Sequence, residues 1–169
     1  MFISEIKLDD KAKKVLSVIE KKIGFIPIHF ELLASLNLKK FKLFMQELSY
    51  IQNLKDINKD FFVFIRLYVA FKENFEYCKV FNKKLLLSLN YTNEQINSVI
   101  NDISNIPLDN KHKSLAIASI KAIYEYKNFT NEDINNLKNV NWSDEYIYTA
   151  IDHTAMLFKN ARILRAYLK

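Results

Sequence analysis

Residues Glu73 to Leu89 read Glu-Asn-Phe-Glu-Tyr-Cys-Lys-Val-Phe-Asn-Lys-Lys-Leu-Leu-Leu-Ser-Leu, and they hold the only cysteine of the chain, Cys78. They follow Phe61–Phe71, the most apolar stretch of the sequence, in which Arg66 is the one charged residue. A helix is expected to begin just before Cys78, and the unpaired backbone N–H groups there favour a thiolate. A free cysteine is more often a small buried hydrophobic residue. Both interpretations of Cys78 stay open on these residues.

The composition favours an all-α protein. Half of the 169 residues are hydrophobic and 14% are aromatic, which indicates a chain that buries a core. The chain has one glycine and two prolines, which are too few to form many tight hairpin turns. We therefore expect a single helical domain over residues 1–169. It would comprise N-terminal helices over 1–55, a core helical hairpin over 56–104 that carries Cys78, and C-terminal helices over 105–169.

The charge and the apolar runs limit the classes of partner. The net charge is +6, but only three of the 25 basic residues are arginines, and the lysines are spread along the chain. Arginine is the residue that binds phosphates and guanines in bidentate fashion, so we expect no specific nucleic-acid partner. The Phe61–Phe71 run is too short to span a bilayer, which predicts a soluble protein without a membrane partner. A single cysteine and the lack of an apolar leader point to the cytoplasm.

Apolar spacing and capping residues predict the order of the helices. The nearly all-apolar Phe61–Phe71 segment belongs at the centre of the fold or in an oligomer interface. Within it, Arg66 is expected to be structural, with an anion-binding role kept open. The expected helices cover residues 8–23, 28–36, 38–54, about 59–74, a segment that begins near Cys78, one that begins near 93, 109–127, one that begins near 131, and 144 to near the C-terminus.

One short sequence motif occurs three times, as Asn90–Ile96, Asn128–Ile134 and Asn141–Ile147. Each copy places a serine or threonine where a helix N-cap belongs and a glutamate in the first turn after it. The aromatic residue before each cap is placed to pack on the isoleucine as a hydrophobic staple. Gln95 and Asp133 occupy the capping-box position, although Asp133 is short for that contact. The motif therefore predicts three helix starts, with N-caps Thr92, Thr130 and Ser143.

With this order of helices, the chain resembles the carboxymuconolactone decarboxylase and alkylhydroperoxidase D (AhpD) family. The resemblance rests on the Gly24-Phe-Ile-Pro27 break before a short helix, the Asn74-Phe-Glu-Tyr-Cys78 segment, Asn90–Ile96, and the later Ser143-Asp-Glu-Tyr-Ile147 segment. It covers most of the chain from about residue 24, and its chemically specific part is Tyr-Cys. It implies an AhpD-like helical bundle.

In the redox branch of that family, a Cys-x-x-Cys pair works with a histidine one turn after the second cysteine and a glutamate on the preceding helix. The resemblance places Phe75 and Cys78 at the two cysteine positions, Asn82 at the histidine position and Val63 at the glutamate position. The resolving thiol and the proton relay of a dithiol cycle are therefore missing. The histidine base of the decarboxylase branch is missing too.

Three functions remain open. The leading hypothesis is a binding or structural homologue that has lost dithiol chemistry, with Cys78 at the floor of the inherited pocket. The second is a one-cysteine thiol peroxidase or reductase in which Cys78 attacks and an external thiol resolves. The third is a small-molecule lyase or isomerase that does not use the thiol. Arg66, Glu73 and Tyr77 are the possible pocket residues.

Two properties of the site follow from these hypotheses. Burial of Cys78 outweighs the helix N-terminus, so its thiol pKa is expected at or above its ordinary value of about 8.5. No cofactor is expected, and His29, His112 and His153 form no metal-ligand pair. Each histidine is expected to be a satisfied surface or core residue.

The partners expected are a small-molecule ligand and further copies of the chain. The apolar Phe61–Phe71 helix suggests a homo-oligomer. The resemblance favours a trimer or hexamer, with a dimer also possible.

Overall fold

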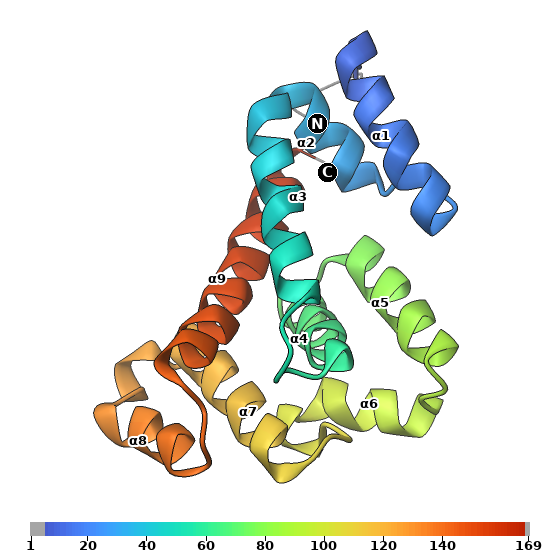
Figure 1. The fold of residues 1–169 in the computed structure, drawn as a ribbon. Coiled ribbons are helices and arrows are strands. Elements are labelled where there is room, and N and C mark those ends of the chain that lie inside the picture. The colour runs from blue at the N-terminus through green and yellow to red at the C-terminus, as the bar shows by residue number, and fades with distance from the viewer. Residues whose placement is uncertain (1–5, 168–169) are drawn as a thin grey trace. The chain divides into compact units, whose positions relative to one another are not determined.

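The computed structural model describes residues 6–167, apart from the side chains of residues 22 and 23. Throughout this range the regular structure is helical, which confirms the all-α fold class (Figure 1). The chain divides into two compact units. Residues 55–163 form one unit, and the residues up to 54 form the other together with those from 164 on. The single domain expected over 1–169, whose ends lie outside the described residues, stays a prediction.

The first unit contains helices α1 (Asp10–Ile23), α2 (Ile28–Leu36) and α3 (Leu38–Gln52). The Asp9 side chain caps α1, and Gly24 ends it in the left-handed conformation with φ of 82°, as expected. The ring of Phe30 lies 5.5 Å from that of Phe41 at the centre of the unit. The fully packed core of this unit comprises Ala12, Leu16, Phe30, Ala34 and Phe41.

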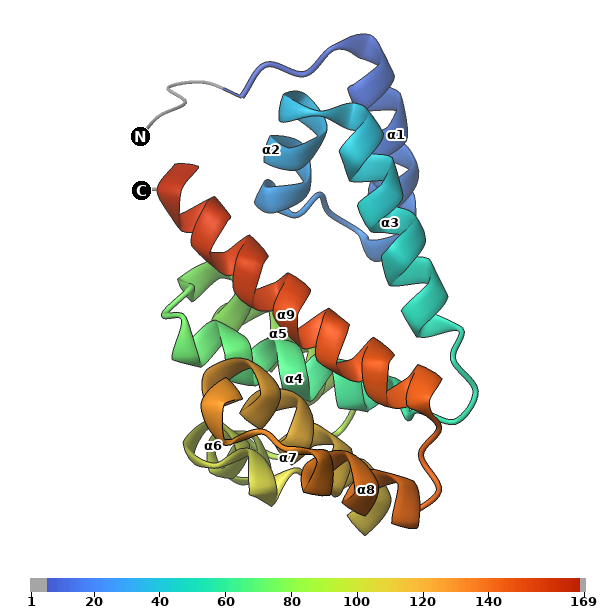
Figure 2. The ribbon, with the colours of Figure 1, turned by 90° about the vertical axis from the view of Figure 1, so that its left-hand side faces the viewer.

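The second unit is built around α4 (Lys59–Lys72), which packs against α5, α6 and α7. Figure 2 shows α9 running across α4, and the rings of Phe62 and His153 lie 5.0 Å apart at that crossing. Nine of the fourteen α4 residues are buried. The other helices of the unit are α5 (Glu76–Ser88), α6 (Asn93–Asn101), α7 (Asn110–Tyr124), α8 (Asn131–Asn139) and the part of α9 (Asp144–Tyr167) up to residue 163, with 3₁₀ turns at Ile103–Asn105 and Tyr126–Asn128.

The burial of α4 changes the argument for an oligomer. Phe61 and Phe64 are fully buried within one chain, so the apolar surface of α4 is covered by the protein's own helices. An interface between copies is not needed to cover it. The described helices also include none that is long and apolar enough to cross a membrane.

Three helices end in an asparagine followed by an aromatic residue. Asn74, Asn90 and Asn141 have φ of 51°, 68° and 63°, the left-handed conformation that follows many helix C-termini. The backbone N–H of the next residue donates to a carbonyl five residues earlier in each case. This is the Schellman arrangement. The donor–acceptor pairs are Phe75 to Ala70, Tyr91 to Leu86, and Trp142 to Leu137.

Each of the three copies of the motif begins a helix, as predicted. Thr92 and Gln95 form a reciprocal capping box at the start of α6. At the start of α8, a carboxylate oxygen of Asp133 accepts a hydrogen bond of 2.8 Å from the Thr130 backbone N–H. Asp133 thus occupies the capping-box position as expected and makes the contact although its side chain is short. The backbone N–H of Tyr146 donates to the Ser143 hydroxyl at the start of α9.

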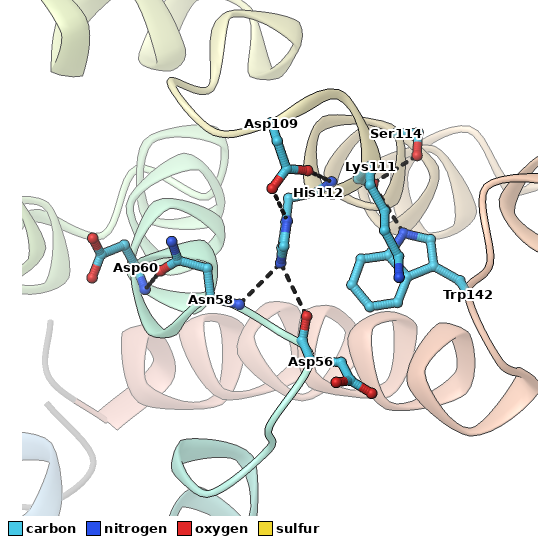
Figure 3. A network of polar contacts seen from close by, with 8 residues as sticks. All are labelled: Asp56, Asn58, Asp60, Asp109, Lys111, His112, Ser114 and Trp142. Carbon is cyan, nitrogen blue, oxygen red and sulfur yellow. Dashed lines mark hydrogen bonds and ion pairs between the residues drawn. The ribbon is translucent and has the colours of Figure 1, made fainter.

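His112, near the start of α7, connects this helix to the loop before α4 (Figure 3). Its Nδ1 lies 2.7 Å from a carboxylate oxygen of Asp109, the N-cap of α7. Its Nε2 accepts a hydrogen bond of 3.0 Å from the Asn58 backbone N–H. These two partners assign the ring proton to Nδ1. His112 is therefore a structural connection, with both ring nitrogens in use.

Candidate functional site

Cys78 is the third residue of α5, close to the helix N-terminus. Its side chain is partly buried. Burial raises the pKa of the thiol to about 12, while the positive charge of Arg66 acts in the opposite direction. The direction agrees with the sequence-based expectation. Desolvation outweighs both the helix N-terminus and the nearby cation, so the thiol is protonated at neutral pH.

Asn82 lies one turn after Cys78, at the position where the resemblance places the family histidine. It is 1% exposed, and both polar atoms of its amide have partners. The Nδ2 atom donates to the Cys78 backbone carbonyl at 2.8 Å, and the Oδ1 atom accepts from Arg66 Nε at 3.1 Å. An amide neither accepts nor releases a proton near neutral pH. Asn82 therefore holds Arg66 in place beside α5 but supplies no base for Cys78.

Arg66 comes from the middle of α4 and is partly exposed. Burial lowers the pKa of its guanidinium to about 10, which leaves it charged at neutral pH. Its hydrogen bond to Asn82 engages one of five N–H donors. Among the described residues, no carboxylate forms an ion pair with it. The partner found is the amide oxygen of Asn82.

His153 is the residue that the sequence analysis missed. It is 1% exposed on α9, and neither ring nitrogen has a hydrogen-bond partner in the part of the chain that the structure describes. Burial, with a further contribution from the charge of Arg66, lowers its pKa to about 3. The ring is therefore neutral. The expectation of a satisfied histidine was wrong, and no sequence pattern around residue 153 marks an unpaired imidazole.

Arg66, Cys78, Asn82 and His153 together form what we call the Arg66 cluster. The helices α4, α5 and α9 supply these residues, and Phe62 adds an aromatic ring edge-on to His153. The cluster offers a fixed cation, a neutral imidazole and a thiol.

The other predicted site residues have different surroundings. Val63 and Phe75 are buried apolar residues, 5% and 8% exposed. Glu73 accepts a hydrogen bond of 2.9 Å from Arg162 on α9 and also interacts with Tyr124 on α7. Tyr77 stacks on Phe81 with ring centroids 6.4 Å apart. Glu73 thus belongs to a second polar group.

The described residues include no set of side chains suited to bind a metal ion. No group of three or more histidine, cysteine, aspartate or glutamate side chains is placed to hold an ion there.

The helices of this chain, with a buried α4 that leads into α5 and a long α9 across it, are arranged as in solved structures of two other proteins. The structure of an uncharacterized peroxidase-related protein from Silicibacter sp. TM1040 matches with a TM-score of 0.80 and 18% identity, over 94% of this chain and 83% of that chain. An uncharacterized peroxidase-related protein from Ralstonia eutropha JMP134, described as an alkylhydroperoxidase AhpD core, matches with a TM-score of 0.77 and 15% identity, over 94% and 84%.

The chain therefore has the AhpD-like fold, as the sequence resemblance implied. No family model matches the sequence, and no curated protein matches it. At these identities the likeness shows the fold alone.

Proposed function

We propose that this protein is a small-molecule-binding homologue with the AhpD-like fold that has lost dithiol redox chemistry. The observation that carries the proposal is the environment of Cys78. The residue one turn away is Asn82, whose amide is not a base, and burial raises the pKa of the thiol to about 12. A protonated thiol is a poor nucleophile toward peroxides and disulfides.

The absence of a second thiol supports the same proposal. Phe75, which the resemblance places at the first cysteine position, is the buried N-cap of α5. A sulfenic acid formed on Cys78 would have no resolving cysteine within the chain, because Cys78 is the only cysteine. The AhpD-like site is thus retained as a set of helices rather than as a dithiol centre.

One observation favours the alternative of a one-cysteine peroxidase or reductase. The guanidinium of Arg66 lowers the pKa of the Cys78 thiol against the effect of burial. A ligand or a local movement that exposed the thiol would strengthen this influence relative to desolvation. The alternative needs an external thiol as the reductant.

The rate of iodoacetamide labelling from pH 6 to 10 tests the proposal. At a pKa near 12, the folded protein holds on the order of a thousandfold less thiolate than a free cysteine, so labelling is expected to be slow and to rise without a plateau. The same protein unfolded in urea serves as the fast-labelling control.

Peroxidase turnover provides the second measurement. Consumption of cumene hydroperoxide with dithiothreitol should be the same for the wild type and Cys78→Ser. A labelling midpoint below about pH 7, with turnover that disappears in Cys78→Ser, would reject the binding proposal in favour of the one-cysteine enzyme.

A further inference from the structure

Among the described residues, the guanidinium of Arg66 has no counter-charge. It lies on a helix in which nine of fourteen residues are buried and apolar, and its one hydrogen bond within the described part of the chain goes to a neutral amide. Charges placed among apolar residues are normally paired, because desolvation costs several kcal/mol per ion. Asn82 binds the Nε atom, and no described residue accepts a hydrogen bond from the two terminal nitrogens, which can therefore act as a pair of parallel donors. The partly exposed side chain keeps them within reach of a ligand.

His153 provides the second, independent observation. Its buried imidazole has no partner for either nitrogen among the described residues, although buried polar groups are nearly always hydrogen-bonded. A neutral imidazole offers one N–H donor and one acceptor. His153 packs on Phe62, with ring centroids 5.0 Å apart, and Arg66 lies four residues after Phe62 on the same face of α4. The imidazole and the guanidinium therefore lie on the same side of this helix.

The geometry points to a binding site for a small organic carboxylate at the Arg66 cluster, an assignment that rests on the proposed binding function. The terminal nitrogens of Arg66 bind the carboxylate oxygens in bidentate fashion, and His153 donates a further hydrogen bond. The Phe62 ring, packed edge-on against His153, faces the carbon chain of the ligand. A monoanion matches the single positive charge of the cluster better than a phosphate dianion does.

The test is a titration of the full chain with ¹³C-labelled propionate, followed by NMR at constant ionic strength. Propionamide, which has the same shape without the charge, and inorganic phosphate are titrated in parallel. We expect saturable binding of propionate and weaker binding of both comparison compounds. Equal binding of propionamide, equal binding of phosphate, or no saturation by propionate would each overturn the assignment.

Variants locate the site. Arg66→Gln should weaken propionate binding by about tenfold or more, which corresponds to the loss of a charge-assisted hydrogen bond. Lys84→Gln removes the same charge from an exposed position of α5 and should leave binding unchanged. If Arg66→Gln does not fold, Arg66→Lys keeps the charge but loses the bidentate geometry, and it should still bind more weakly than the wild type. Unchanged affinity in the folded Arg66 variant would overturn the assignment.

Failure of this inference is distinguishable from failure of the proposed function. Turnover that depends on Cys78 would refute the binding proposal whatever propionate does. An absence of both turnover and propionate binding would refute the carboxylate site alone.

Discussion

Arg66 and Asn82 give this part of the fold a positive charge and a neutral amide, where the resemblance implies an acid and a base. The family positions imply a glutamate on α4 and a histidine on α5, an acid and a base that move a proton. The resemblance places Val63 and Asn82 at those positions, and Arg66 lies one turn along α4 from Val63. The guanidinium of Arg66 donates a hydrogen bond to Asn82. The site is therefore suited to hold a negative charge rather than to pass a proton.

His153 makes the stability of the protein depend on pH. Its pKa is about 3 in the folded protein and about 6.5 in the unfolded chain. Above pH 6.5 the ring is neutral in both states and contributes nothing to the pH dependence. As the pH falls from 6.5 toward 3, only the unfolded chain takes up the proton, so the free energy of unfolding decreases. The limiting slope is about 1.4 kcal/mol per pH unit.

The prediction is that His153→Leu flattens this dependence. Urea unfolding of the wild type at pH 7 and pH 5 should show a loss of stability that is smaller in the variant. His29, whose pKa burial lowers to about 4, acts in the same direction and accounts for part of the remaining slope. His29→Leu is the control for that part. Equal slopes in the wild type and His153→Leu would show that the ring is hydrated or hydrogen-bonded in solution.

At the scale of elements, the Asn-aromatic pairs both end one helix and place the next. The left-handed asparagine turns the chain, and the aromatic residue after it closes the Schellman hydrogen bond. Phe75 and Trp142 are then buried, at 8% and 2% exposed. In the copies at Asn90 and Asn141, the N-cap of the next helix follows directly. Two helices are thus joined by a few residues without a glycine.

Asn90 tests this role of asparagine. Asn90→Gly should raise the melting temperature slightly, because glycine adopts a φ of 68° without strain. Asn90→Val should destabilise the protein by about 1–2 kcal/mol, because a β-branched residue is strained there. Thermal unfolding followed by circular dichroism measures both.

Asn128→Val is the matched control. Asn128 begins the second copy of the motif but is not among the described residues with positive φ, so its substitution should have little effect. Equal losses at Asn90 and Asn128 would mean that side-chain contacts, rather than backbone conformation, determine the preference for asparagine.

The helix order was predictable from sequence because periodicity and caps are local signals. The α2 helix runs over the expected residues 28–36, and Thr92, Thr130 and Ser143 lie at helix starts as predicted. The left-handed asparagines were not predicted, because asparagine is compatible with several conformations and only the backbone hydrogen bonds distinguish them. His153 was missed because its lack of partners depends on the packing of α9 against α4.

Of the candidate site, the sequence identified Cys78, Asn82 and Arg66 but not how they are connected. The bond between Arg66 and Asn82 joins residues sixteen positions apart on two helices, and its existence depends on the register between α4 and α5. Glu73 was grouped with Cys78 because they are close in sequence. The structure instead pairs Glu73 with Arg162, a residue 89 positions away.

At the scale of the whole molecule, the homo-oligomer remains a prediction, but the surface expected to form its interface changes. Since α4 is covered within the chain, a homo-oligomer needs another apolar surface. Val80 and Leu87, seven residues apart on α5, are 54% and 39% exposed, and a spacing of seven places them on one face of the helix. Light scattering should give a trimer or hexamer, or a dimer, of the 20.0 kDa chain.

Val80→Lys with Leu87→Lys should lower the measured mass. A mass near that of one chain for the wild type would reject self-association. An unchanged oligomer in the double variant would exclude this face of α5 as the interface.

The position of His112 makes one backbone amide a reporter of the contact between α7 and the loop before α4. The Nε2 atom accepts a hydrogen bond of 3.0 Å from the Asn58 backbone N–H. Hydrogen–deuterium exchange at Asn58 is therefore slow while α7 holds this loop and accelerates when the two separate, which reveals the state of the segment that leads into the central helix.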